Sequence, residues 1–214
     1  MFQDKETSYR ALNDRAARFA NTMISLGLKP RDKVAVISRN CTEYVEIICG
    51  LVKAGLVHVP VNWRLSPEEM NYVINNSDSV AVVLGGDFSE KLNPVRKSLK
   101  NVPAGNYLLI GGAAEGIKSY EEMLARAPAA EPAVENGEFD PYFIGYTSGT
   151  TGKPKGAVTR HANWAIKIQG VELLLGISST PDEVQLLTMP LFHMNAINSM
   201  GASLYLGQTV VVMD

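Results

Sequence analysis

The first part of the chain shows two hydrophobic patterns, the periodic spacing of an amphipathic helix and the unbroken apolar run of a buried strand. In residues 9–26 the apolar positions recur at steps of three and four residues: Tyr9, Leu12, Ala16, Phe19, Met23 and Leu26. This spacing predicts an amphipathic helix that stops at Gly27. The run "KVAVIS" (33–38) follows without alternation, which indicates a strand that is buried on both faces.

The next elements predict a βαβ unit. The sequence "CTEYVEIICGLVKAG" (41–55) is typical of a helix with Gly55 past its end, and "LVHVPV" (56–61) is typical of another buried strand. Two strands joined in this way pair in parallel by default. Ser66, Pro67 and Glu69 have the spacing of a capping box with proline in the first turn, so a helix is expected over residues 67–76.

Predicted strands and helices continue to alternate to the end of the sequence. Strands are predicted at 79–86, 106–112, 142–146, 156–160, 183–189 and 208–214, and helices at 90–100, 120–126, 161–176 and 198–207. This order indicates an α/β fold with a doubly wound, mostly parallel sheet flanked by helices. Residues 127–140 are rich in Pro, Ala and Glu and lack periodicity, which is typical of an exposed connector.

Composition and charge exclude several classes of protein. Of the 214 residues, 46% are hydrophobic and 20% are charged, and the net charge is −2, as in ordinary globular proteins. A near-neutral chain offers no broad basic surface, so no nucleic-acid partner is expected. No run approaches the ~18 apolar residues of a membrane span and the first residues lack a signal-peptide core, so we expect a cytoplasmic protein.

One stretch departs from the alternating pattern. The sequence "YTSGTTGKPKGA" (146–157) contains three glycines and two lysines, and it has no large apolar side chain after the tyrosine. Glycines let a ligand approach the backbone N–H groups, hydroxyls donate hydrogen bonds and lysines supply positive charge, which together suit a polyphosphate. The stretch also follows a predicted buried strand, where open α/β sheets bind ligands.

Two alternatives to a polyphosphate cradle of this kind are a familiar nucleoside-triphosphate loop and a flexible, solvated linker. The first does not fit, because only two residues separate Gly149 from Gly152 and Pro154 follows Lys153 where Ser or Thr is required. Composition alone leaves the linker open.

The sequence "YTSGTTGKPKG" resembles the phosphate-binding signature of the adenylate-forming superfamily, which includes acyl-CoA synthetases, adenylation domains of peptide synthetases and luciferases. Residues 8–77 look like the opening region of this family, and "LLTMPLFHMNAINSM" (186–200) resembles its second core motif. The resemblance implies the N-terminal domain of the adenylate-forming fold. It also implies the reaction: a carboxylate attacks the α-phosphorus of ATP, Mg-pyrophosphate leaves, and the acyl-adenylate passes to a thiol, commonly that of coenzyme A.

Several site residues follow from this resemblance. The residues expected to wrap the β- and γ-phosphates of ATP are Thr147, Ser148, Gly149, Thr150, Thr151, Gly152 and Lys153. Lys155 is expected to add positive charge nearby. The family also requires Mg²⁺, which would bridge phosphate oxygens. A loop threonine is a candidate for contact with the metal, but its ligands stay unassigned.

His193, in "PLFHM", matches a motif histidine that lies between the phosphate site and the acyl pocket of the family. A neutral imidazole can orient a carboxylate; the alternative is a hydrogen-bonded histidine at a strand end. Where many relatives have glycine, this chain has Ala196. Residues 189–200 are rich in methionine, which suits either the wall of an acyl pocket or ordinary core packing. Trp63 and Arg64 are expected in a surface hairpin or gate.

Four other residues have side chains that could react or bind a metal, but they are expected to be structural. Cys41 and Cys49 lie eight residues apart, which suits neither a disulfide framework nor a metal site, so both are expected to be buried free thiols. His58 lies in a predicted buried strand and is expected to hydrogen-bond to the main chain. His161 matches a family position and is expected to have a structural role.

Members of the resembled family are more than twice as long as this chain. The segments with their adenine-binding, metal-binding and ribose-binding residues, and a small C-terminal domain with a lysine for the reacting carboxylate, would follow Asp214. We therefore expect residues 1–214 to be the N-terminal part of the large AMP-binding domain of an ATP-dependent acid–thiol ligase, inactive alone. Its incomplete sheet would expose an edge suited to homo-oligomer formation.

Three alternatives to this function stay open. They are a non-catalytic nucleotide-binding or interaction module, an adenylation domain that passes acyl groups to a carrier protein, and an unrelated nucleoside-triphosphate hydrolase. Similarity of residues 59–83 to stand-alone acyl-CoA ligases favours coenzyme A as the acceptor. The carboxylic acid itself is left open.

Overall fold

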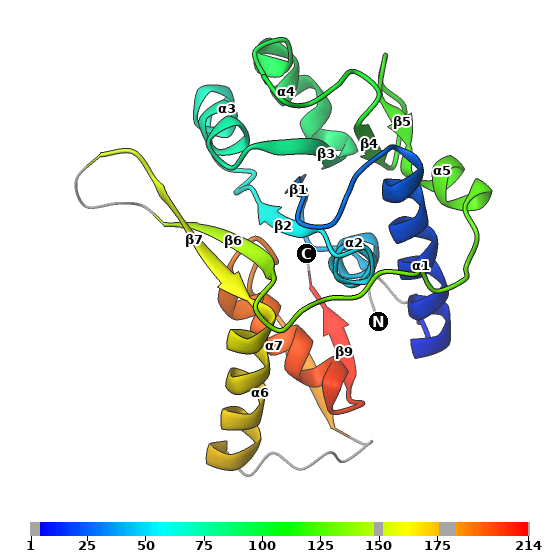
Figure 1. The fold of residues 1–214 in the computed structure, drawn as a ribbon, viewed down its shortest axis with the longest axis vertical. Helices are drawn as coiled ribbons and strands as arrows, with labels where there is room; N and C mark the ends of the chain where they lie inside the picture. The colour runs from blue at the N-terminus through cyan, green and yellow to red at the C-terminus, as the bar shows by residue number, and fades with distance from the viewer. Residues whose placement is uncertain (1–4, 148–151, 176–182, 214) are drawn as a thin grey trace.

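A seven-stranded sheet forms the centre of the computed structural model, which describes residues 5–147, 152–175 and 183–213 (Figure 1). The strand order is β5–β4–β3–β1–β2–β6–β7, and the pairs are parallel except for antiparallel β6 and β7. The strands are β1 (Lys33–Ile37), β2 (Val57–Pro60), β3 (Ser79–Gly85), β4 (Tyr107–Ile110), β5 (Lys118–Ser119), β6 (Pro141–Thr147) and β7 (Lys155–Arg160). The predicted mostly parallel α/β fold is confirmed.

Helices cover both faces of this sheet. They are α1 (Tyr9–Ser25), α2 (Thr42–Lys53), α3 (Pro67–Asn76), α4 (Ser89–Arg96) and α5 (Tyr120–Arg126), with a 3₁₀ turn η1 (Gly86–Phe88) before α4. Val34 and Val36 of β1 belong to the core beneath α1, α2 and α5, whereas Ala35 and Ile37 belong to the core beneath α3 and α4. Because successive strand residues point to opposite faces, β1 must be apolar throughout, which explains its unbroken run.

The ends of the early helices lie where the sequence predicts them. Ser66 and Glu69 form the expected capping box at the start of α3. Gly27 and Gly55 follow α1 and α2 with φ angles of 87° and 66°, a left-handed conformation that glycine adopts without a steric penalty.

The last two strands form a separate sheet, which the sequence does not reveal. Strands β8 (Val184–Leu187) and β9 (Thr209–Val212) pair in parallel as a two-stranded sheet. Helix α7 (Met194–Tyr205) packs against both of these strands, and α6 (His161–Leu175) packs against α7 and β7. In Figure 1 this unit occupies the lower end of the molecule. A Cβ on Gly201 of α7 would lie 2.9 Å from the Trp164 ring of α6, so glycine permits the close contact of the two helices.

Two predicted helices have different bounds in the structure. Helix α4 ends at Arg96, four residues before the predicted end, and contains Pro94. Helix α7 begins at Met194 rather than at 198, so that His193 is its N-cap residue.

The segment between α5 and β6 is mostly exposed, as predicted, but it is fastened to the first two helices. In Figure 1 it runs from α5 past α1 and α2 to β6. The Arg18 side chain donates to the carbonyl oxygen of Ala127 at 2.6 Å, and the Asn136 amide donates to that of Val52 at 2.8 Å. Lys53 forms an ion pair with Glu131. The connector therefore joins the parts of the chain without acting as a free linker.

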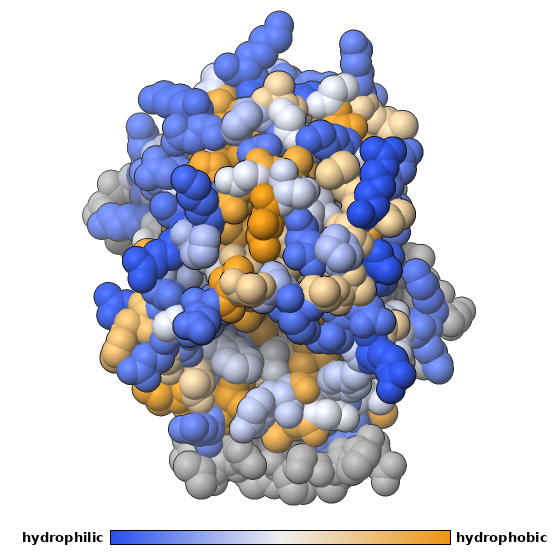
Figure 2. All heavy atoms as spheres, turned by 45° about the vertical axis from the view of Figure 1, so that its right-hand side comes forward, coloured by the Kyte–Doolittle hydropathy of each residue, from blue (hydrophilic) through white to orange (hydrophobic). Residues whose placement is uncertain are grey.

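The surface is mostly hydrophilic, with apolar side chains gathered in places. In Figure 2 the upper part of the face is largely hydrophilic, whereas apolar side chains show around the hollow in its middle and below it. Val184 and Leu186 of β8 are 63% and 50% exposed, so the small sheet has an apolar surface. Within residues 5–147, 152–175 and 183–213, no helix is both long and apolar enough for a membrane span.

Candidate functional site

The candidate residues gather where the carboxyl ends of the two sheets meet. The phosphate-binding stretch follows β6, Trp63 follows β2, and His193 lies beyond β8. Because β2 and β6 are parallel neighbours, their carboxyl ends lie at the same edge of the large sheet. This edge is where open α/β sheets bind ligands.

The two strands that flank the phosphate-binding stretch form a hairpin. Thr147 at the end of β6 pairs with Lys155 at the start of β7. Thr147, Gly152, Lys153 and Lys155 are all exposed, and Gly152 has a φ of 136°, which favours glycine. The predicted residues Ser148, Gly149, Thr150 and Thr151 lie outside the described residues.

Helix α3 holds both ends of this hairpin tip. The Tyr72 hydroxyl donates to the carbonyl oxygen of Pro154 at 3.0 Å, and the Tyr146 hydroxyl donates to Asn76 Oδ1 at 2.8 Å. Tyr72 and Asn76 are four residues apart and therefore share one face of the helix. Burial raises the pKa of Tyr146 to about 12, so its hydroxyl stays protonated as a donor at neutral pH.

The Tyr72 ring also contacts Lys153, which is predicted to bind phosphate. Lys153 Nζ lies 5.4 Å from the ring centroid, within the range of a cation–π interaction. Neither Tyr72 nor Asn76 is predicted from the sequence as part of the site. Their four-residue spacing was a signal, but their partners lie 82 and 70 residues away in the sequence.

The described part of the hairpin suits an anionic polyphosphate. It offers two exposed lysines, the Thr147 hydroxyl and an open backbone at Gly152, and such groups pair with phosphate oxygens. The described residues contain no group of three His, Cys, Asp or Glu side chains that could hold a metal ion.

His193 is exposed at the start of α7, and the next residue, Met194, lies close to the strand that enters the hairpin. Its backbone N–H donates to the carbonyl oxygen of Pro190 at 2.9 Å, and its ring lies 4.7 Å from the Phe192 ring. A Cβ on Gly145 of β6 would lie 3.6 Å from Met194 Cε. His193 is the N-cap residue of α7, and its side chain does not cap the helix by a hydrogen bond.

Trp63 and Arg64 lie in a turn between β2 and α3 rather than in a hairpin, and their expected role as a gate stays a prediction. The half-buried Trp63 ring lies between two guanidinium groups, with Arg39 at 4.8 Å and Arg64 at 4.2 Å from its centroid. The Phe192 ring is 6.5 Å from Trp63. Arg39 and Phe192 are not predicted from the sequence as neighbours of Trp63, because these ring contacts join three separate loops.

Part of the methionine-rich segment packs in the core. Leu191, Ala196, Ile197 and Met200 are buried with the side chains of the large core, which favours core packing for these four residues. Ala196 continues the regular helix α7, so alanine in place of glycine is compatible with the local backbone.

The structure corrects the expectation for His58. This residue is 2% exposed, and its Nε2 lies 3.3 Å from the Tyr44 hydroxyl. Nδ1 has no hydrogen-bond partner in the described part of the chain, so the predicted bond to the main chain is wrong. Burial lowers the pKa of His58 to about 3.

His161, Cys41 and Cys49 complete the set of residues that are expected to be structural. His161 packs its ring 5.3 Å from that of Tyr142. Cys41 and Cys49 are free thiols, but both are partly rather than fully buried, and Cys41 precedes α2 as its N-cap. Burial raises the pKa of Cys41 to about 12 and that of Cys49 to about 11, so both are protonated and poorly nucleophilic at neutral pH.

Comparison with known proteins gives consistent matches. A family model described as "AMP-binding enzyme" matches residues 1–214. The long-chain-fatty-acid–CoA ligase FadD13 of Mycobacterium tuberculosis is 33% identical over 210 residues, which cover 98% of this chain and 40% of that protein. A crotonobetaine/carnitine–CoA ligase of Salmonella enteritidis is 32% identical over 197 residues, which cover 89% of this chain and 37% of that protein. The chain thus spans about 40% of the length of the curated relatives it matches.

Solved structures match over nearly the whole chain. The N-terminal domain of FACL13 from Mycobacterium tuberculosis, with a bound inhibitor, superimposes with a TM-score of 0.86 at 32% identity, covering 97% of this chain and 50% of that one. The anthranilate CoA ligase AuaEII in complex with anthranoyl-AMP superimposes with a TM-score of 0.92 at 25% identity, covering 100% of this chain and 41% of that one.

Proposed function

The chain belongs to the AMP-binding enzyme family, and on that premise we propose that it supplies the N-terminal part of an acid–thiol ligase. In this reaction a carboxylate attacks the α-phosphorus of ATP and forms an acyl-adenylate with release of pyrophosphate. The acyl group then passes to a thiol, for which we propose coenzyme A. The names of the relatives, which are CoA ligases for different acids, support the acceptor but leave the acid open.

One observation carries the proposal: an exposed hairpin with two lysines is anchored at both ends. The Tyr72–Pro154 and Tyr146–Asn76 bonds fix where β6 and β7 deliver the tip of the hairpin. A preorganised set of N–H groups and lysines stabilises phosphate charge better than a free linker, because less ordering is required on binding. We assign Thr147, Ser148, Gly149, Thr150, Thr151, Gly152 and Lys153 to the β- and γ-phosphates, and Lys155 to added charge nearby.

His193 would serve the carboxylate rather than the phosphates. The imidazole is exposed, and its neighbour Met194 lies beside the strand that enters the hairpin. We therefore assign His193 to a hydrogen bond with an acid held there. Bound Mg²⁺ would neutralise phosphate charge and make pyrophosphate a better leaving group.

The experiment that tests this proposal is acid-dependent exchange of labelled pyrophosphate into ATP, measured on the protein that carries this chain. A panel of short, long and aromatic acids is needed, because the acid is open. Exchange that requires an acid supports the ligase, with residues 1–214 alone expected to be inactive. Silence across the panel despite ATP binding would favour a non-catalytic nucleotide-binding module. Phosphate release without any acid would indicate a hydrolase.

A further inference from the structure

Asn40 is a buried polar residue at the junction of the two sheets. It lies between β1 and α2 and is 7% exposed. Its Nδ2 donates to the carbonyl oxygens of Met189 at 3.1 Å and Met213 at 2.8 Å, and its Oδ1 accepts from Leu191 N at 2.7 Å. One side chain thus binds three backbone groups of the β8–β9 unit. A buried amide that uses both of its ends in this way fixes its partners in one arrangement.

The three partners lie at the carboxyl ends of β8 and β9. Met213 directly follows β9, and Met189 and Leu191 lie in the short segment between β8 and α7. That segment leads to His193, whose own backbone N–H closes a turn onto Pro190. Asn40 binds the residues on both sides of Pro190. It therefore fixes the turn that sets where the imidazole of His193 lies.

From this geometry we infer that Asn40 is a positioning residue for His193. Asn40 lies just after the carboxyl end of β1 in the large sheet. Strand β1 pairs in parallel with β2, and β2 pairs in parallel with the hairpin strand β6. The bonds of Asn40 thus fix the distance between the hairpin and the histidine across two sheets. A displacement of about 1 Å at such a site can reduce a reaction rate by up to about a hundredfold. The inference rests on the proposed function only for the role of His193 in catalysis.

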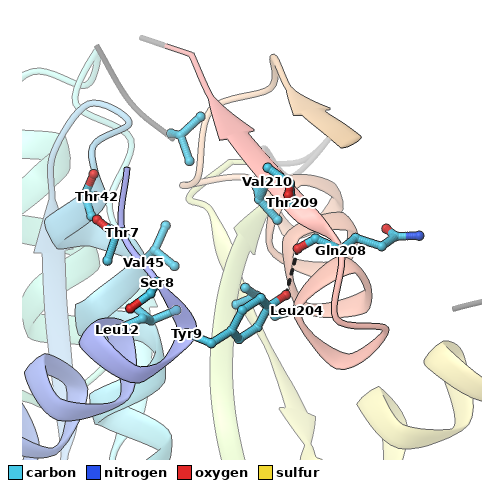
Figure 3. Close-up of a pocket in the computed structure, with 11 residues that line it drawn as sticks. Thr7, Ser8, Tyr9, Leu12, Thr42, Val45, Leu204, Gln208, Thr209 and Val210 are labelled. Atoms are coloured by element: carbon cyan, nitrogen blue, oxygen red, sulfur yellow. Dashed lines mark hydrogen bonds between the residues drawn. The ribbon is translucent and has the colours of Figure 1, made fainter. Parts of the chain in front are cut away.

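A second tether of the same unit provides a matched control. The Tyr9 hydroxyl donates to the carbonyl oxygen of Gln208 at 2.7 Å (Figure 3). This bond joins α1 to the start of β9, which is the end of the small sheet away from His193. Figure 3 shows Tyr9 and Gln208 on opposite walls of a cavity that is also lined by Leu12, Val45 and Val210. Tyr9→Phe removes a tether of the unit without a change near the histidine.

The test compares Asn40→Ala with Tyr9→Phe in two readouts. The first is NMR of the histidine rings in residues 1–214, where the chain has only three histidines and His58 and His161 are internal references. The second is the kinetics of acid activation in the protein that carries this chain. We expect Asn40→Ala to shift the His193 signals alone and to lower kcat about tenfold, with less than a twofold change in KM for ATP. Tyr9→Phe is expected to leave the His193 signals and kcat unchanged.

The inference is overturned if Asn40→Ala leaves the chemical shifts of His193 unchanged and kcat within twofold of the parent. It is also overturned if Tyr9→Phe changes the chemical shifts and kcat as much as Asn40→Ala does. If the alanine variant does not fold, Asn40→Asp replaces it, because its carboxylate still accepts from Leu191 N but cannot donate to Met189 and Met213. Unmoved His193 signals in that variant would overturn the inference as well. A parent without acid-dependent activity would refute the proposed function, while the NMR comparison would still decide the role of Asn40.

Discussion

Burial sets the protonation state of His58, and this single residue makes the stability of the fold depend on pH. The ring lies between Tyr44 and Phe143, with centroids 5.6 and 5.7 Å away. Burial lowers its pKa from 6.5 to about 3. Between these values the unfolded chain binds a proton that the folded chain does not, so the free energy of unfolding falls as the pH falls.

The expected size of this effect follows from the difference in pKa. Each pH unit between about 6.5 and about 3 costs about 1.4 kcal/mol, so lowering the pH from 7 to 5 should cost about 2 kcal/mol through His58. Urea denaturation at the two pH values measures it. His58→Leu is the control, since leucine does not titrate and the variant should lose less stability over the same interval. Equal losses in both proteins would contradict the assignment.

At the scale of elements, helix α3 and the β6–β7 hairpin act as one unit. Tyr72 and Asn76 bind the two ends of the hairpin tip, and the Tyr72 ring also contacts Lys153. In Tyr72→Phe the ring stays and the bond to Pro154 is lost, which removes about 1 kcal/mol of anchoring. We therefore expect ATP to bind about fivefold more weakly, as measured by calorimetric titration of the protein that carries this chain.

Asn75→Ala on the same helix is the matched control for this prediction. The Asn75 side chain binds Asn71, Ser98 and Lys100, and it forms no hydrogen bond to the described residues of the hairpin. This variant should lose stability through the contact with the segment after α4 while its ATP affinity stays that of the parent. Equal ATP affinity of Tyr72→Phe and the parent would show that α3 does not anchor the hairpin.

At the scale of the whole molecule, the sequence predicts the helices and strands better than the tertiary contacts between them. Hydrophobic spacing locates α1 and β1, because these elements bury one face or both faces in a contiguous core, and the capping box locates the start of α3. The phosphate hairpin is recognisable because its composition is local. The bonds of Asn40 span 149 to 173 residues, so no local pattern reveals them. The separation of β8 and β9 into a second sheet is likewise decided by tertiary packing.

The exposed strands β7 and β8 bear on the expected formation of homo-oligomers. The side chains of β7 are mostly exposed, and Val158 is 59% exposed. Val184 and Leu186 give β8 an apolar surface. Exposed edges of this kind favour strand pairing between chains. Homo-oligomer formation through the sheet edge stays a prediction.

The central claim is that the hairpin between β6 and β7 binds the phosphates of ATP, and calorimetric titration with ATP–Mg²⁺ tests it most directly. The titration uses the protein that carries this chain and its Lys153→Ala variant. Lys153 is exposed, so its loss should leave the fold intact and weaken ATP binding by about tenfold or more, as expected for a lost charge-assisted contact. Equal affinity in the two proteins, or no binding by the parent, would contradict the account.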